Sequence, residues 1–155
     1  MIFTVSIIIL NKNKPELLIP CVQSIWEQVD TLKTNIHIEI LIGDTGSTNN
    51  SIIEFYQSIQ KQFSNVVTKV IYLKKYHFSK NNNEIAKQAN GQILIFLNND
   101  TIGFDHWIEN LLMHFHKPEV GVVGPKLLYG FNDRVQHAGV HFYRSGELSY
   151  LGFHV

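Results

Sequence analysis

Residues 93–101 read ILIFLNNDT, a run of large apolar residues that changes abruptly to polar ones. A short, continuous apolar run predicts a strand that is covered on both faces of a sheet. Similar runs predict further strands over residues 5–10, 36–42 and 66–73. The chain therefore begins as a series of buried strands, and polar residues follow where they end.

Helices are expected between these strands. Residues 51–63 carry apolar side chains at helical spacing. The same spacing occurs earlier, at Leu18, Val22, Ile25, Trp26 and Val29. Asn13 is the expected cap of that earlier helix, and Pro20 is expected to kink it or delay its start. A short helix before residue 93 is expected to end at Gly91 as a left-handed cap. Alternating strands and helices predict an α/β fold with a mostly parallel sheet flanked by helices.

The C-terminal part predicts a helix over residues 107–115 and then short strands. Residues 120–123 and 134–142 are expected strands, the second in a β-hairpin with residues 148–153. A chain of 155 residues fits one domain over residues 1–155.

The composition excludes several classes of protein. Apolar residues make up 45% and charged residues 17%, which is enough to bury a core. Thirteen basic residues balance thirteen acidic ones, so no nucleic-acid partner is expected. A single cysteine, Cys21, excludes an internal disulfide and a zinc site built on several thiolates. No segment reads as a signal peptide or a membrane span, so we expect a soluble, cytoplasmic protein.

In a parallel sheet, ligands bind beyond the carboxyl ends of the strands. Glycine-rich phosphate loops are missing from these positions, because the first strand is followed by Asn11-Lys12-Asn13-Lys14. The strand ends instead offer carboxylates and amides: Asp44 after the second strand, and Asn98, Asn99 and Asp100 after the fourth. Lys12 and Lys80 lie in the expected loops at this edge, where they can approach a diphosphate.

Each aspartate allows two interpretations. Asp100 can bind a divalent cation that bridges to phosphate oxygens, or it can belong to an ordinary turn. Asp44 can accept hydrogen bonds from a nucleoside, or it can close an Asx turn with Gly46 and Ser47. Their expected position at one edge of one sheet favours the binding interpretation. The eight histidines do not show metal-ligand spacing, and only His137 is kept as a candidate.

Several segments, in order along the chain, resemble the nucleotide-binding half of family-two glycosyltransferases, which have the GT-A (Rossmann-like) fold. The segments are residues 5–11, 21–28, 38–48, 83–91, 96–101, 120–126 and 135–139. The last two resemble segments of bacterial members that act on surface polysaccharides. Residues 96–101 occupy the place of the family's Asp-x-Asp element.

The resemblance implies roles for individual residues. Asp100 would ligate Mn²⁺ or Mg²⁺, and the cation would bridge the diphosphate of the donor. The implied nucleotide-binding residues are Leu10, Asn11, Asp44, Ser47, Asn83, Asn98 and Asn99. Lys80 and His137 are further candidates, His137 for the acceptor side or the pyrophosphate.

The sequence departs from the family pattern in two places. Asn98 stands where the family often has its first Asp. The family's general base is an acidic residue in a later segment, but Glu147 is the only acidic residue after Asp133, so the catalytic base is unknown. We therefore expect the chain to stop before the acceptor half.

The expected function is inverting transfer of a sugar from a nucleotide-diphosphate donor, with UDP as the expected nucleotide, to a saccharide or lipid-linked acceptor. Peripheral membrane association at the inner face, or a homo-oligomer, is compatible with this role. The alternative is a non-catalytic nucleotide-binding or interaction module within a larger enzyme. A receiver domain would need acidic residues after the first strand, and a nucleotidyltransferase would normally show a glycine-rich basic loop there.

Overall fold

The computed structural model describes residues 3–32, 35–62, 66–132 and 134–150. The chain forms two compact units, Met1–His106 and Trp107–Val155. The expectation that residues 1–155 form a single domain stays a prediction.

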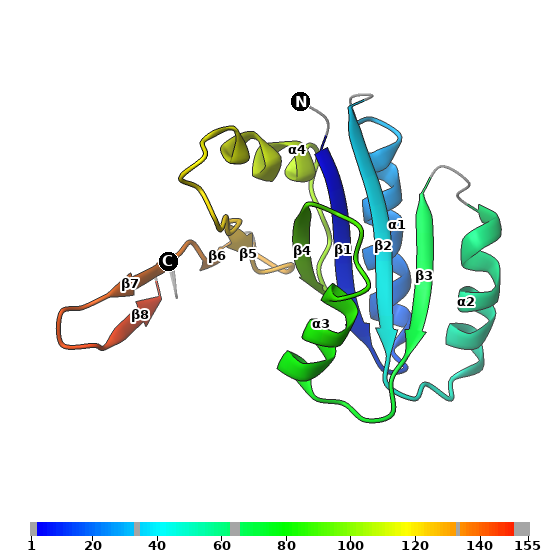
Figure 1. Cartoon of the computed structure of the whole chain (residues 1–155). Coiled ribbons are helices and arrows are strands. Elements are labelled where there is room, and N and C mark those ends of the chain that lie inside the picture. The colour runs from blue at the N-terminus through cyan, green and yellow to red at the C-terminus, as the bar shows by residue number, and fades with distance from the viewer. Residues whose placement is uncertain (1–2, 33–34, 63–65, 133, 151–155) are drawn as a thin grey trace. The chain divides into compact units, whose positions relative to one another are not determined.

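The first unit is built on a four-stranded parallel sheet with the strand order β3-β2-β1-β4 (Figure 1). The strands are β1 (Phe3–Asn11), β2 (Ile36–Asp44), β3 (Val67–Tyr72) and β4 (Ile93–Asn98). The parallel α/β fold predicted from the sequence is therefore confirmed. β2 and β3 lie on one side of β1, whereas β4 lies on its other side. The strand order therefore reverses between β1 and β4. This is the place where parallel sheets bind ligands.

Three helices accompany the sheet: α1 (Pro15–Val29), α2 (Asn50–Gln62) and α3 (Phe78–Ala86). Figure 1 shows α3 in front of the sheet and α1 behind it. On the α3 side, Ile85 packs with Ile8 and Leu41, and all three are fully buried. Leu94 and Phe96 of the edge strand β4 stay exposed. The sheet is therefore well covered around β1 and β2 and open at β4.

The start of α1 differs from the expectation. The helix begins at Pro15 and contains Pro20, so Pro20 does not delay it. Its N-cap is Lys14, which has a left-handed backbone, and not Asn13. The Asn13 side chain instead accepts hydrogen bonds from the backbone N–H groups of Thr48 and Asn49 at 2.8 and 3.0 Å, just before α2. Asn13 therefore serves the entry to a different helix.

Gly91 also differs from the expectation, because it is not a left-handed cap: α3 ends earlier, at Ala86. A side-chain Cβ at Gly91 would lie 2.4 Å from the backbone nitrogen of Ser6, so the position requires a close approach of two backbones. The neighbouring Glu39 accepts hydrogen bonds of 2.6 Å from the Ser6 hydroxyl and from the Asn90 N–H. Burial opposes ionisation of Glu39, but these bonds outweigh it and lower its pKa.

The second unit contains short elements: α4 (Trp107–Leu112), the 3₁₀ turn η1 (Met113–His116), β5 (Leu127–Leu128), β6 (Val135–His137), β7 (Val140–Phe142) and β8 (Leu148–Tyr150). The predicted hairpin is confirmed as the antiparallel pair β7–β8, although residues 151–155 lie outside the described part. The strand expected over residues 134–142 is divided, because Gly139 adopts a φ of 134° between β6 and β7.

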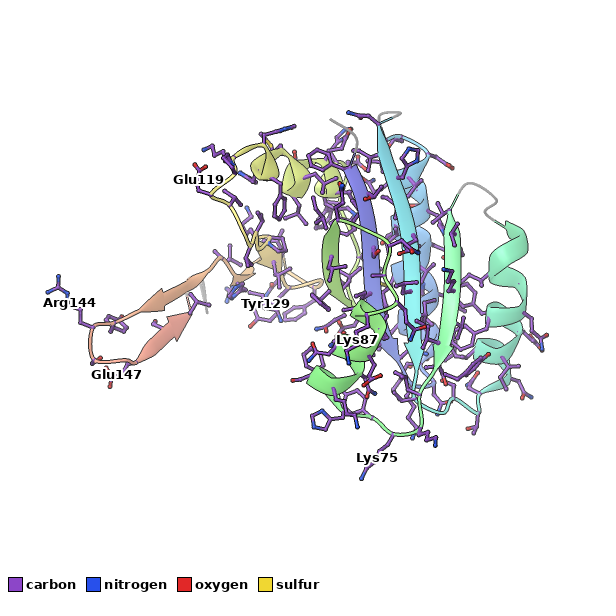
Figure 2. The ribbon with its side chains drawn as sticks, in the orientation of Figure 1. Lys75, Lys87, Glu119, Tyr129, Arg144 and Glu147 are labelled. Atoms are coloured by element: carbon purple, nitrogen blue, oxygen red, sulfur yellow. The ribbon has the colours of Figure 1, made fainter. Side chains whose placement is uncertain are left out.

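The strand expected at residues 120–123 was wrong, since these residues have no regular structure. Gly121 and Gly124 lower the strand propensity there. Arg144 and Glu147 both lie at the tip of the β7–β8 hairpin (Figure 2). Within the described residues, no helix is both long and apolar enough to cross a membrane.

Candidate nucleotide-binding site

A cavity of about 190 Å³ opens at the carboxyl ends of β1 and β4. Its walls combine aromatic rings with amides and one lysine. The lining residues are Leu10, Asn11, Lys12, Tyr76, Phe78, Asn82, Phe96, Leu97, Asn98 and Asn99. The cavity lies at the point where the strand order reverses, and apolar walls with a few polar groups are typical of small-molecule sites.

The strand register brings the predicted polar residues to this edge. Asn11 lies opposite Asp44 on β2, and Leu10 lies opposite Asn98 on β4. The sequence-based expectation that Asp44 and the residues after β4 share one edge of the sheet is thereby confirmed.

The carboxylate of Asp44 is buried and saturated with hydrogen bonds. It is 2% exposed. One oxygen accepts from the N–H groups of Gly46 and Ser47 at 2.9 and 2.8 Å. The other accepts from the Ser47 hydroxyl and from the Tyr56 hydroxyl. Gly46, with a φ of 96°, permits this tight turn. All four acceptor positions of the carboxylate are therefore used within the protein.

Ser47 also joins the loop after β2 to the loop after β1. Its hydroxyl oxygen accepts a 2.7 Å hydrogen bond from the Asn13 N–H. Together with the bonds that the Asn13 side chain accepts from Thr48 and Asn49, this bond holds the two loops side by side. The loops that the sequence assigned to the nucleoside thus form one ordered surface.

A chain of hydrogen bonds connects this surface to the loop after β4. The Asn99 amide donates to Asn11 at 2.8 Å, Asn11 donates to the Tyr56 hydroxyl at 3.0 Å, and Tyr56 donates to Asp44 at 2.9 Å. Burial raises the pKa of Tyr56 well above its usual value, so the phenol remains a proton donor. The chain aligns the side chains that follow β1, β2 and β4.

Asp100 has a different environment. It is exposed, and it forms no hydrogen bond or ion pair with the described residues. The turn that carries it is closed by a bond from the Thr101 N–H to the Asn98 carbonyl at 3.2 Å. Asn98 and Asn99, which precede it, both line the cavity. The Asp100 carboxylate is therefore available to a ligand.

The other sequence candidates are distributed unevenly. Lys12 lines the cavity, whereas Lys80 is an exposed residue of α3 and not part of a loop. Lys75 extends away from the sheet (Figure 2). Asn83 is exposed and does not line the cavity, and the adjacent Asn82 does.

His137 belongs to the second unit, where it pairs with Leu127 between β6 and β5. Its assignment to the acceptor side or the pyrophosphate stays a prediction.

The described residues contain no group of three or more His, Cys, Asp and Glu side chains that could enclose a metal. Mg²⁺ and Mn²⁺ at nucleotide sites need fewer protein ligands than that. One or two carboxylates are enough, because phosphate oxygens and water complete the coordination. The unengaged carboxylate of Asp100 fits this requirement. Cys21 does not, because burial raises its pKa to about 12 and keeps the thiol protonated.

Sequence reasoning missed Tyr56, Asn82 and the aromatic pair Tyr76 and Phe78. Tyr56 follows the apolar spacing of its helix, and this spacing does not predict where its phenolic hydroxyl points. Asn82 lies within a run of asparagines, where spacing alone does not distinguish one member from the next. Aromatic residues in an otherwise polar segment were the available signal for the pair.

Comparison with known proteins identifies similar chains. The sequence model described as "Glycosyl transferase family 2" matches residues 6–152. The O-antigen biosynthesis protein RfbC of Myxococcus xanthus is 36% identical over 137 residues, which is 88% of this chain. The chain spans only 10% of the length of that relative.

Two solved structures share the fold. The mannosyltransferase PcManGT of Pyrobaculum calidifontis, in complex with GDP-Man and Mn²⁺, superposes with a TM-score of 0.67 at 16% identity. The match covers 78% of this chain and 34% of that protein. S. aureus TarS 1-349, in complex with UDP-GlcNAc, gives a TM-score of 0.57 at 20% identity, over 84% of this chain and 42% of the TarS 1-349 chain.

Proposed function

The chain belongs to glycosyl transferase family 2, and from this premise we propose that it binds a nucleotide-diphosphate sugar in the cavity between β1 and β4. The observation that carries the proposal is the contrast at the edge of the sheet. The side chains of Asn11, Asp44 and Asn99 are engaged by hydrogen bonds within the protein, whereas the carboxylate of Asp100 is exposed and unengaged. Asp100 does not line the cavity but directly follows Asn98 and Asn99, which do, and an unengaged carboxylate at this place is suited to a cation.

The nucleoside would lie against the ordered surface that the loops after β1 and β2 form. Leu10, Asn11 and Asn99 line the cavity or point toward it, and Asn99 would support the ribose. Asp44 and Ser47 shape this surface through their mutual bonds. A direct bond from Asp44 to the nucleoside would have to replace one of the four that it already accepts.

Asp100 would hold Mn²⁺ or Mg²⁺, and Lys12 would approach the diphosphate from the opposite loop. When bound, the cation supplies Lewis-acid stabilisation of the departing diphosphate. Asn98 contributes a neutral amide to the same edge, which can accept a hydrogen bond from a sugar or ribose hydroxyl. That PcManGT is recorded with GDP-Man and Mn²⁺ supports this assignment.

The proposed reaction is inverting transfer from a UDP-sugar to a saccharide or lipid-linked acceptor at the cytoplasmic face of the membrane. The similarity to an O-antigen biosynthesis protein supports a polysaccharide product. Inverting transfer needs a base for the acceptor hydroxyl. The base stays unassigned, and Glu147, at the tip of the β7–β8 hairpin, accepts a hydrogen bond from the Ser145 hydroxyl at 3.1 Å.

Titration calorimetry with UDP, in Mn²⁺ and in EDTA, tests the proposal. We expect UDP to bind clearly more tightly with Mn²⁺, and GDP in the same titration to bind less tightly than UDP. Binding that is indifferent to the metal would contradict the proposal. Metal-dependent UDP binding without hydrolysis or transfer of the sugar from a UDP-sugar would favour the alternative, a nucleotide-binding module within a larger enzyme.

A further inference from the structure

Three side chains of α1 form a stripe that faces the loop after β4. Cys21, Ser24 and Gln28 are three and four residues apart, so they share one face of the helix. All three are buried, with exposed fractions of 0%, 7% and 6%. Buried polar groups normally have specific partners. Here most of these partners belong to residues 98–106, the segment that carries Asp100.

The first two contacts flank Asp100 along the chain. The Cys21 thiol donates to the Asn98 carbonyl at 3.6 Å. The Ser24 hydroxyl oxygen accepts a 3.2 Å hydrogen bond from the Gly103 N–H. Asp100 therefore lies between two points at which its loop is attached to the helix.

The third contact fixes the end of the loop. The Gln28 side-chain oxygen accepts from the His106 N–H at 2.6 Å, and its amide nitrogen donates to the Asp105 carboxylate at 3.4 Å. His106 has a φ of 61°, a conformation that a residue other than glycine rarely adopts without support. The Gln28 side chain supplies that support by accepting a hydrogen bond from the backbone N–H of His106.

We propose that Ser24 and Gln28 are positioning residues that hold residues 98–106 so that Asp100 presents its carboxylate to the cation. The inference rests on the proposed function. Packing of α1 against the sheet does not need these polar groups, because Leu18, Val22 and Ile25 are fully buried on the same helix. The polar stripe serves the loop, because the N–H groups of Gly103 and His106 donate hydrogen bonds to it. Groups that orient a metal ligand without touching the metal commonly change its affinity.

The test compares UDP affinity in Mn²⁺ and in EDTA for the 155-residue chain and its variants. Gln28→Met keeps the length of the side chain and removes both hydrogen bonds, and Ser24→Ala removes the bond to Gly103. For each variant we expect roughly a tenfold loss of UDP affinity in Mn²⁺ and less than a twofold change in EDTA. The EDTA titration reports whether the nucleoside surface is still folded.

Each variant has a control that makes the same replacement at another helix position. Gln23→Met makes the same replacement on the exposed face of α1. Ser58→Ala removes a hydroxyl that donates to the Phe55 carbonyl at 2.9 Å, just as Ser24 donates to the Cys21 carbonyl at 2.8 Å. Both controls are expected to leave UDP affinity unchanged in either condition.

A rescue separates positioning from general stability. Gln28→Glu alone should weaken Mn²⁺-dependent binding, because it places a second carboxylate 3.4 Å from that of Asp105. Adding Asp105→Asn reverses the direction of the hydrogen bond between these two side chains, because the side-chain amide at position 105 then donates to the carboxylate at position 28. The double substitution should therefore restore Mn²⁺-dependent UDP binding. Equal losses in Mn²⁺ and in EDTA, no loss at all, or no rescue would overturn the inference. If the unsubstituted chain shows no metal-dependent UDP binding, the proposed function fails, and the inference fails with it.

Discussion

Asp44 ends β2 and Asp100 follows β4, two strands that lie on either side of β1 and reach the same edge of the sheet, yet the protein treats the two aspartates in opposite ways. Asp44 is 2% exposed and accepts four hydrogen bonds from Gly46, Ser47 and Tyr56. Asp100 is exposed and has no hydrogen-bond partner among the described residues.

The difference shows how one residue type can serve two purposes at one site. The carboxylate of Asp44 is satisfied by hydrogen-bond donors of the protein, so it orders the loop after β2. The charge of Asp100 remains uncompensated, so it can attract a cation and, through it, a diphosphate. Asp44 therefore chiefly orders its loop, whereas Asp100 is the proposed metal ligand.

The largest expected effect is on stability. Asp44→Ala would leave the buried donors from Ser47 and Tyr56 without their acceptor, and we expect a loss of about 4 kcal/mol in the free energy of unfolding. Urea unfolding followed by circular dichroism measures it. Asp100→Ala, at an exposed turn, should change the stability by less than about 0.5 kcal/mol. Similar losses for the two variants would contradict the comparison.

The next effect concerns binding. Asp100→Asn keeps the shape of the turn but removes the charge, and we expect UDP affinity in Mn²⁺ to fall about a hundredfold. In EDTA, the affinity should stay within about twofold of the original, because the nucleoside surface is unaltered. Calorimetry checks both values. An unchanged affinity in Mn²⁺ would show that the cation is held elsewhere.

A smaller effect is expected at the hydroxyl that joins Asp44 to Asn11. Tyr56→Phe should cost about 1 kcal/mol of stability at neutral pH. Because the folded protein raises the pKa of Tyr56, its contribution is complete below the usual pKa of 10.0 and declines as the pH rises above that value. The gap in the free energy of unfolding between the unsubstituted protein and Tyr56→Phe should therefore narrow above pH 10.

Urea unfolding at a series of pH values measures this gap. Tyr72→Phe is the matched control, because Tyr72 is 75% exposed. A gap that stays constant above pH 10, or an equal effect of Tyr72→Phe, would show that the Tyr56 hydroxyl does not support Asp44.

The smallest effect is expected from Lys12, which lines the cavity. Lys12→Gln should lower UDP affinity about threefold at low salt and less at high salt, because an exposed charge is screened. Lys75→Gln, on a side chain that points away from the sheet, should have no effect. Equal effects of the two substitutions would mean that the contribution is one of net charge alone.

The sequence predicted the parts of the site that depend on local pattern. Apolar runs located the strands, and the parallel arrangement then placed Asp44 and the residues after β4 at one edge. The choice between an Asx turn and a free carboxylate was left open, because it depends on contacts. Asp44 is held partly by Tyr56, and Tyr56 is reached from Asn11, 45 residues away in the chain.

Other features escaped prediction for the same reason. Asn13 satisfies backbone groups 35 and 36 residues further along, at the entry to α2, although local spacing suggested a cap for α1. Gly91 is required by the backbone of Ser6, on a strand 85 residues earlier. Periodicity reports which face of an element is buried, and it does not report which distant backbone lies against that face.

A crystal structure of the chain with UDP and Mn²⁺, recorded with the anomalous signal of manganese, tests the central claim most directly. We predict a manganese peak within coordinating distance of the Asp100 carboxylate and of the UDP phosphates, with Asp44 still bonded to Ser47 and Tyr56. A bound nucleotide whose manganese lies away from Asp100, or an Asp44 released from its loop to ligate the metal, would contradict the account.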